Sequence, residues 1–200
     1  PRANKTKGAN MADVHYLYEP MGAAKTGKLI ESAMGFQRKN VQYEAIKPAK
    51  DVRFTENEIV SRSGQRIPAL AVPNLSGYTP KPGTKFLLLD EIQFLPPTDV
   101  DKLVHLADVQ GIITMCYGLL TDSNEQMFET SKRLIEVGAK LHQLECSCEI
   151  DDCLKKASHN LRFDGNGKVI QNGQQFCLGS DNFKGVCRDH YYEMYYGRGK

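Results

Sequence analysis

The strongest constraint on the fold is a run of four apolar residues, Phe86-Leu87-Leu88-Leu89, between Lys85 and Asp90. Unbroken apolar strands are typical of parallel sheets that are covered on both faces. Other strand-like runs occupy residues 13–18, 43–46 and 112–117, and helix-like runs occupy residues 25–39, the segment from Asp99 onward, and 128–137. This alternation predicts an α/β protein with a parallel sheet and helices on both of its faces.

Two segments need a separate interpretation. Residues 48–83 are rich in Pro, Gly, Ser and Arg and have weak periodicity, so we expect loops and a short hairpin there. In the helix that begins near Asp99, Leu103, Leu106 and Val109 share one side. This spacing predicts that all three side chains pack on the sheet.

The character of the chain changes after Leu144. We expect a flexible basic tail at residues 1–11, an α/β domain at 12–144 and a small C-terminal module at 145–200. In that module, short β-like pieces occupy residues 161–163, 168–170 and 175–178. The tail lacks apolar periodicity, which favours a flexible segment over a nucleic-acid-binding arm.

Composition excludes two classes of partner. The 200 residues include 26 basic and 24 acidic side chains, a net charge of +2, so no general nucleic-acid footprint is visible. No apolar run approaches the roughly 20 residues that cross a bilayer. The N-terminal segment also lacks the apolar core of a secretory signal. We therefore expect a soluble cytoplasmic protein without a membrane partner.

The segment Tyr18–Thr26 joins the first expected strand to the first expected helix. A strand, a small-residue loop, Lys-Thr and a helix form the layout of a phosphate-binding loop, whose backbone N–H groups hold phosphates and whose hydroxyl ligates Mg²⁺. The candidate residues are Met21, Gly22, Ala23, Ala24, Lys25 and Thr26. The motif is imperfect, because Glu19 and Ala24 stand where the pattern has glycine. A Lys-Thr pair that opens an ordinary amphipathic helix is the alternative.

Two carboxylates, Asp90 and Glu91, directly follow the buried apolar run. Charged groups are costly to place at the end of a buried strand unless they have a role. Asp90 is placed to hold Mg²⁺, and Glu91 is placed to act as a base toward a substrate hydroxyl. The alternative is a helix cap with an acidic first turn.

Five of the six cysteines lie after residue 145. Two short-spaced pairs, Cys148/Cys153 and Cys187/His190, have the residue types of a tetrahedral structural zinc site. Bound zinc stabilises a module that is too small for a large core of its own. Cys146 is a fifth candidate for four positions, and scattered buried thiols are the alternative.

Seven segments, in this order, resemble the zinc-containing thymidine kinases of bacteria, many viruses and animal cytosol: residues 21–26, 47–53, 61–64, 90–95, 116–122, 153–157 and 186–191. The most specific are Asp90-Glu-Ile-Gln-Phe94 and Cys116-Tyr-Gly-Leu-Leu-Thr-Asp122. The resemblance implies transfer of the γ-phosphate of ATP to the 5′-hydroxyl of thymidine.

The resemblance also implies roles for individual residues. Lys25 would hold phosphates with Arg62 nearby, Thr26 and Asp90 would hold Mg²⁺, and Glu91 would accept the hydroxyl proton. A C-terminal "lasso" loop, anchored by zinc, would cover the base. The expected nucleoside-binding residues are Gln93, Phe94, Phe128, Phe176, Cys177, Leu178, Gly179 and Phe183. Members that resemble this chain assemble as homotetramers.

Several positions depart from the family pattern: Glu19, Ala24, Leu120, Ser123, Phe183 and the insert at residues 149–152. At Ala24, a Cβ would cost about 1–2 kcal/mol if φ were positive. These departures support a second hypothesis, a catalytically impaired relative kept as a binding or structural subunit. A third hypothesis is a kinase for another deoxynucleoside, because Ser123 replaces an aromatic residue of the base pocket.

Overall fold

The computed structural model describes residues 13–22, 24–51, 57–175 and 182–197. Its centre is a sheet of six parallel strands, which confirms the expected α/β architecture. From one edge to the other, the strands are β5 (Leu70–Val72), β2 (Tyr43–Pro48), β6 (Phe86–Leu89), β7 (Ile113–Gly118), β1 (Val14–Tyr18) and β8 (Lys140–Gln143).

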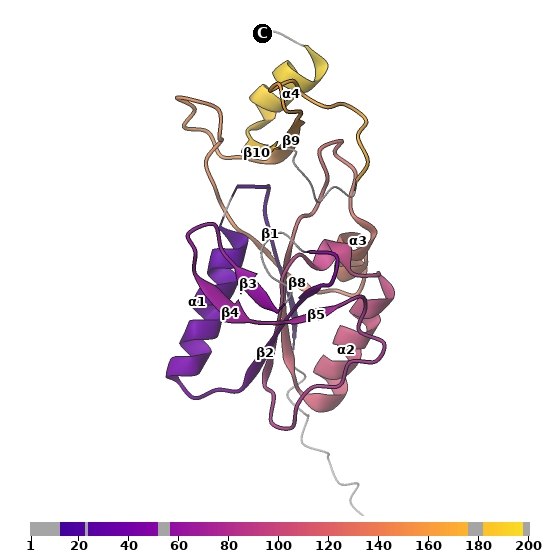
Figure 1. The fold of residues 1–200 in the computed structure, drawn as a ribbon. Helices are drawn as coiled ribbons and strands as arrows, with labels where there is room; N and C mark the ends of the chain where they lie inside the picture. The colour runs from indigo at the N-terminus through magenta and orange to yellow at the C-terminus, as the bar shows by residue number, and fades with distance from the viewer. Residues whose placement is uncertain (1–12, 23, 52–56, 176–181, 198–200) are drawn as a thin grey trace, which may run out of the picture.

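Helices cover both faces of this sheet (Figure 1). They are α1 (Lys25–Arg38) on one face, and α2 (Thr98–Gln110) and α3 (Glu129–Glu136) on the other. Neighbouring residues of β6 point to opposite faces, so Leu88 joins the core beneath α1, whereas Leu87 and Leu89 join the core beneath α2 and α3. This two-sided burial explains the unbroken apolar run. Among the described residues, no helix has both the length and the apolar content needed to span a bilayer.

Two small elements accompany the parallel sheet. The expected hairpin is formed by β3 (Glu58–Val60) and β4 (Arg66–Pro68), and its Ile59 and Ile67 are buried with the α1 core. A short 3₁₀ helix, η1 (Ile92–Phe94), follows β6 and begins directly after Glu91. Both elements lie beside the cavity that is described below.

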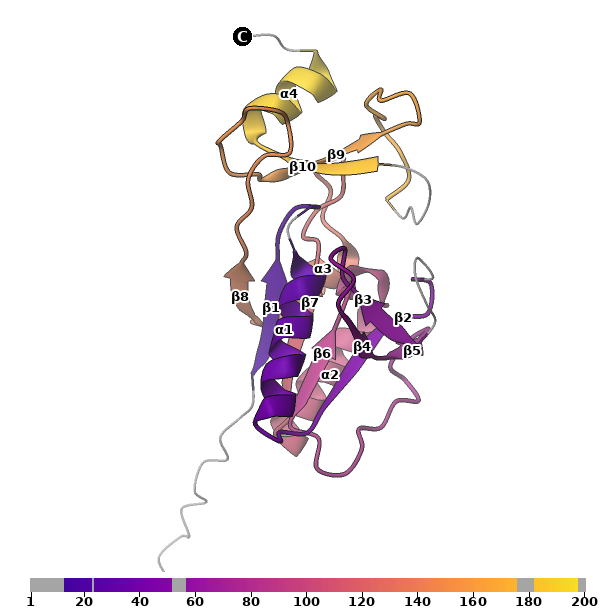
Figure 2. The same cartoon turned by 60° about the vertical axis from the view of Figure 1, so that its left-hand side comes forward.

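A second module stands beyond the carboxyl ends of the parallel strands (Figure 2). It contains the antiparallel strands β9 (His159–Phe163) and β10 (Asn182–Val186) and the helix α4 (Arg188–Tyr196). Its small core includes Leu161, Val186 and Tyr191. The Tyr191 hydroxyl also donates to the Ser123 carbonyl at 2.9 Å, and this bond fixes α4 to the loop after β7.

Two expectations about local structure were wrong. Val109 is 68% exposed, whereas Leu103 and Leu106 are buried. Each three-residue step along a helix moves a side chain about 60° around the axis, so the third member of the series leaves the buried stripe. Residues 168–170 form no strand, and only Val169 pairs with Phe163 in an isolated bridge. Residues 176–178 of the other expected strand lie outside the described residues.

Candidate active site and metal centre

A cavity of about 650 Å³ lies between the parallel sheet and the second module. Backbone and side chains from both parts line it, together with the β3–β4 hairpin. The candidate residues that the structure brings together at its wall are Met21, Gly22, Ala24, Lys25, Thr26, Arg62, Asp90, Glu91, Phe94, Phe128 and Phe183. Ala23, Phe176, Cys177, Leu178 and Gly179, which the sequence also suggested, lie outside the described residues.

The loop between β1 and α1 surrounds the Lys25 side chain, which is only 8% exposed. Lys25 Nζ donates to the carbonyl oxygens of Pro20 at 3.0 Å and Glu19 at 3.3 Å. Burial lowers the pKa of this ammonium, while the carboxylates of Glu91 and Glu19 oppose the shift. The lysine therefore lies at the base of the loop, next to the carboxylates that line the cavity.

Ala24 precedes the first residue of α1 and has φ of −17°. The left-handed strain that a positive φ would impose on a Cβ is therefore absent at this position. In the same loop Gly22 has φ of +91°, a conformation that suits glycine. The glycine that this loop needs is thus Gly22.

Glu19 does not line the cavity with the other charged residues. Its side chain is buried, and its Oε1 has no hydrogen-bond partner among the described residues. Burial raises the pKa of this carboxyl to about 7, although the nearby Lys25 charge acts in the opposite direction. Glu19 thus places less negative charge beside a bound polyphosphate than the sequence suggested.

The side chains of Thr26, at the start of α1, and Asp90, directly after β6, are in contact. The Thr26 hydroxyl donates to Asp90 Oδ2 at 3.1 Å, and Asp90 is 4% exposed. A hydroxyl and a carboxylate are oxygen ligands of the kind that Mg²⁺ takes with substrate phosphates. The pair therefore fits the ligand set that was expected for the cation.

Glu91 has φ of 48°, which is uncommon for a residue with a Cβ, and is 7% exposed. Gln93 Nε2 donates to Glu91 Oε2 at 2.7 Å, and Gln93 Oε1 accepts the Leu119 N–H at 3.1 Å. A Cβ at Gly118 would collide with Gln93 Oε1. Gln93 was expected to support the nucleoside pocket. It does not line the cavity, and its side chain instead orients Glu91 from the side away from the cavity.

Aromatic rings form the apolar part of the wall. Phe94 and Phe128 meet edge to face, with ring centroids 5.9 Å apart and planes at 88°. Phe183, on the first half of β10, lines the cavity from the second module. Rings on these sides can pack against a planar base, because apolar walls and a few polar groups are typical of small-molecule sites.

Four ligand atoms in the second module gather into one cluster. The ligand atoms of Cys148, Cys153, Cys187 and His190 all lie within 4.8 Å of one another. His190 Nδ1 lies 3.3 Å from Cys148 Sγ and 3.5 Å from Cys187 Sγ, and the Cys153 and Cys187 sulfurs are 3.9 Å apart. Tetrahedral zinc, at about 2.3 Å from sulfur and 2.0 Å from nitrogen, separates its ligands by roughly 3.5–3.8 Å. These residues fit a zinc ion, and Cys146 is not in the cluster.

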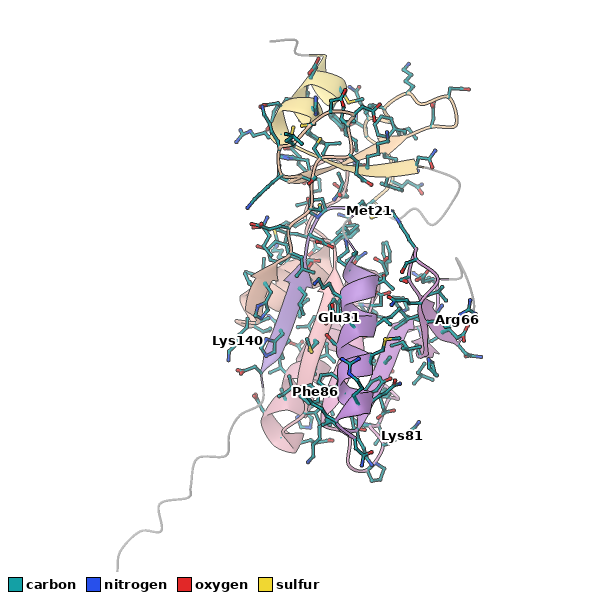
Figure 3. All side chains as sticks on the ribbon, turned by 90° about the vertical axis from the view of Figure 1, so that its left-hand side faces the viewer. Met21, Glu31, Arg66, Lys81, Phe86 and Lys140 are labelled. Carbon is teal, nitrogen blue, oxygen red and sulfur yellow. The ribbon has the colours of Figure 1, made fainter. Side chains whose placement is uncertain are left out.

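Sequence reasoning missed two residues that reach the phosphate loop. Asn160 Oδ1 accepts the Met21 N–H at 2.6 Å, and Asn160 Nδ2 donates to the Thr121 carbonyl at 2.9 Å. Glu149, in the insert between two zinc-ligand cysteines, lies against Gly22. The contacts of Asn160 with Met21 and of Glu149 with Gly22 join residues more than 120 positions apart, so no local sequence pattern predicts them. Figure 3 shows Met21 at the junction of the two parts.

The fold and this site define an α/β protein that carries a composite cavity at the carboxyl ends of its parallel strands and a Cys₃His cluster beyond them. The profile of the family described as "Thymidine kinase" matches residues 12–191. Curated thymidine kinases of Zymomonas mobilis and Enterobacteria phage T4 are 32% and 30% identical over 191 residues, which cover 92% of this chain and 97% of each relative. That of Vibrio cholerae is 32% identical over 194 residues, or 92% of this chain and 98% of the relative. The chain belongs to the thymidine kinase family, and this membership makes it a kinase.

Proposed function

We propose that the protein transfers the γ-phosphate of ATP to the 5′-hydroxyl of thymidine. The observation that carries the proposal is the convergence of Lys25, Thr26, Asp90 and Glu91 on one cavity that has an aromatic wall. Family membership and relatives named thymidine kinase support the choice of reaction. We further propose a cytoplasmic homotetramer, as the family resemblance implies.

The phosphates of ATP would lie over the loop between β1 and α1. Backbone N–H groups at the start of a helix favour an anion, and Lys25 adds a positive charge there. Thr26 and Asp90 would hold Mg²⁺, which neutralises charge on the transferred phosphoryl group. Arg62, on the rim of the cavity, would add a second cation near the phosphates.

Glu91 would remove the proton from the 5′-hydroxyl as the oxygen attacks phosphorus. Its fixed position suits that role, since Gln93 Nε2 donates to Glu91 Oε2 at 2.7 Å and Glu91 lines the cavity. Phe94, Phe128 and Phe183 would pack around the base. Cys148, Cys153, Cys187 and His190 would hold a structural zinc ion that stabilises the module above the substrate.

An impaired relative remains the second candidate because Leu120 and Ser123 differ from the family pattern near the base. Ser123 is buried and lines the cavity, so its smaller side chain leaves room where an aromatic ring was expected. This observation also favours a test of other pyrimidine deoxynucleosides. We favour the active enzyme for two reasons. The proposed base, Glu91, is present, and Ala24 lacks the positive φ that would have strained its backbone.

The decisive experiment follows ATP consumption by the purified protein with thymidine, deoxyuridine or deoxycytidine present. We expect consumption that depends on the nucleoside and is fastest with thymidine. Faster turnover of another deoxynucleoside would change the substrate. A folded protein that contains zinc but turns over none of the three, and binds neither ATP nor thymidine by calorimetry, would establish the impaired relative.

A further inference from the structure

The phosphate loop is held by the second module as well as by its own strand and helix. Asn160 accepts the Met21 N–H at 2.6 Å. Gly185 lies so close to the Met21 carbonyl that a Cβ there would collide with it. Asn160 and Gly185 are register partners on β9 and β10, so this strand pair contacts the Met21 backbone at both its N–H and its carbonyl.

Glu149 joins this contact from the insert between the zinc-ligand cysteines. Its backbone N–H donates to the Gly185 carbonyl at 2.8 Å, and its Oε2 accepts the Gly185 N–H at 2.6 Å. The same carboxylate lies against the Cα of Gly22, where any Cβ would collide with it. Glu149 therefore touches the loop at the residue whose φ of +91° shapes its turn.

The carboxylate also reaches the rim of the cavity. Glu149 Oε1 lies 3.9 Å from Arg62 Nη1, and Arg62 lines the cavity, whereas Glu149 does not. One side chain thus contacts the second module, the phosphate loop and the β3–β4 hairpin. Because Glu149 directly follows Cys148, a metal ion held by that thiolate would also order the backbone from which Glu149 extends.

We propose that Glu149 is a positioning residue that ties the phosphate loop to the zinc-centred module and thereby sets the affinity for ATP. The tie between the loop and the module is inferred from contacts alone. Its effect on ATP affinity rests on the proposed function. A loop that already has its bound conformation loses less entropy when ligand binds. Gly22 is the residue that Glu149 contacts, and its φ of +91° sets the turn of the loop, so this contact restricts the loop where its conformation is decided.

The first test is hydrogen exchange of the ligand-free full-length protein, read on the peptide that contains Met21 and Gly22. Glu149→Ala should speed exchange in this peptide, whereas Asp151→Ala, an exposed acid in the same insert, should not. Glu149→Gln keeps an acceptor oxygen for Gly185 and should give an intermediate rate. Unfolding curves and zinc content identify any variant that fails to fold, and the Gln variant then decides the question. Exchange that is unchanged in both Glu149 variants overturns the proposal.

The second test measures ATP binding by titration calorimetry. Loss of a hydrogen bond to a charged group predicts weaker ATP binding by about tenfold in Glu149→Ala, with the KM for thymidine unchanged. Affinity within twofold of wild type overturns the proposed link to ATP. A wild type that binds no ATP refutes the proposed function instead, and the exchange result still decides whether Glu149 ties the loop.

Discussion

Gln93 and Glu91 form a buried pair at the end of β6, in which Gln93 Nε2 donates to Glu91 Oε2 at 2.7 Å. Gln93 Oε1 accepts the Leu119 N–H at 3.1 Å. Leu119 directly follows β7, the strand next to β6, so this bond fixes the orientation of the Gln93 amide. Gly118 leaves the space that this amide fills. The proposed base is thus oriented by a contact across two neighbouring parallel strands, and this arrangement can be tested directly.

Gln93→Leu should impair turnover more than binding. Leucine fills a similar volume but leaves the Leu119 N–H and the Glu91 carboxylate without this partner. We expect kcat to fall by roughly tenfold with little change in either KM, and the free energy of unfolding to fall by about 1–3 kcal/mol. Steady-state kinetics and urea unfolding measure both effects. Gln93→Glu, which keeps the shape, is expected to fail similarly because two acceptors would face each other; full activity in either variant would contradict the orienting role.

Glu91→Gln should abolish most turnover while leaving ATP binding intact. Removal of a general base costs roughly 10²- to 10⁴-fold in rate. The exposed acid Glu129, at the start of α3, provides the matched control, and Glu129→Gln should keep wild-type kcat. Single-turnover phosphoryl transfer separates the chemical step from product release. A Glu91→Gln enzyme with kcat near wild type would remove this residue from the mechanism.

Phe128→Leu should weaken nucleoside binding specifically. The ring meets Phe94 edge to face on the cavity wall, and an aromatic contact of this kind is worth about 0.5–1.5 kcal/mol beyond its buried area. We expect the KM for thymidine to rise roughly 3- to 10-fold, while the KM for ATP stays constant. The control is Phe86→Leu, at the opposite end of the sheet from Met21 (Figure 3). Equal changes in both KM values for Phe128→Leu would indicate a general disturbance.

The central strands and the metal cluster were predictable because their signals are local. The apolar run of β6 directly reflects burial on two faces, and the Cys148/Cys153 and Cys187/His190 spacings reflect the geometry of a single metal ion. Each signal depends on residues within a few positions of one another. The resemblance in ordered segments then added the relation between distant sites.

The remaining features depend on contacts that no short window contains. All four residues of β8 are exposed, so neither alternation nor apolar content marks this edge strand, and β5 has only three residues. The contacts of Glu149 and Asn160 with the loop join the second module to the end of the sheet. Such long-range contacts require the assembled fold.

The composition of the metal cluster gives a paired prediction about two nearby cysteines. Cys148→Ser removes a ligand thiolate and should lower zinc content well below one ion per chain, whereas Cys146→Ser should leave it unchanged. Because a structural zinc ion stabilises the module that holds it, the first variant should also unfold at lower temperature. Metal analysis and thermal unfolding provide the two readouts. Loss of zinc in Cys146→Ser would show that this thiol takes a place in the metal site.

Buried Glu19 predicts how stability depends on pH. Burial raises its pKa from an ordinary value of 4.5 to about 7, so the folded state binds a proton more tightly than the unfolded state does. The contribution of Glu19 to the free energy of unfolding is therefore fully present below about pH 4.5 and is lost as the pH rises through 7.

Glu19→Gln keeps the size of this side chain but cannot ionise. We expect the variant to be more stable than wild type at pH 8, by an amount on the order of 1–3 kcal/mol, and the difference to shrink toward pH 5. Urea unfolding at a series of pH values measures the difference. The control is Glu31→Gln, whose side chain is 72% exposed and which should give a pH-independent difference. A Glu19→Gln curve parallel to wild type across this range would show that Glu19 ionises at its ordinary pKa in the folded protein.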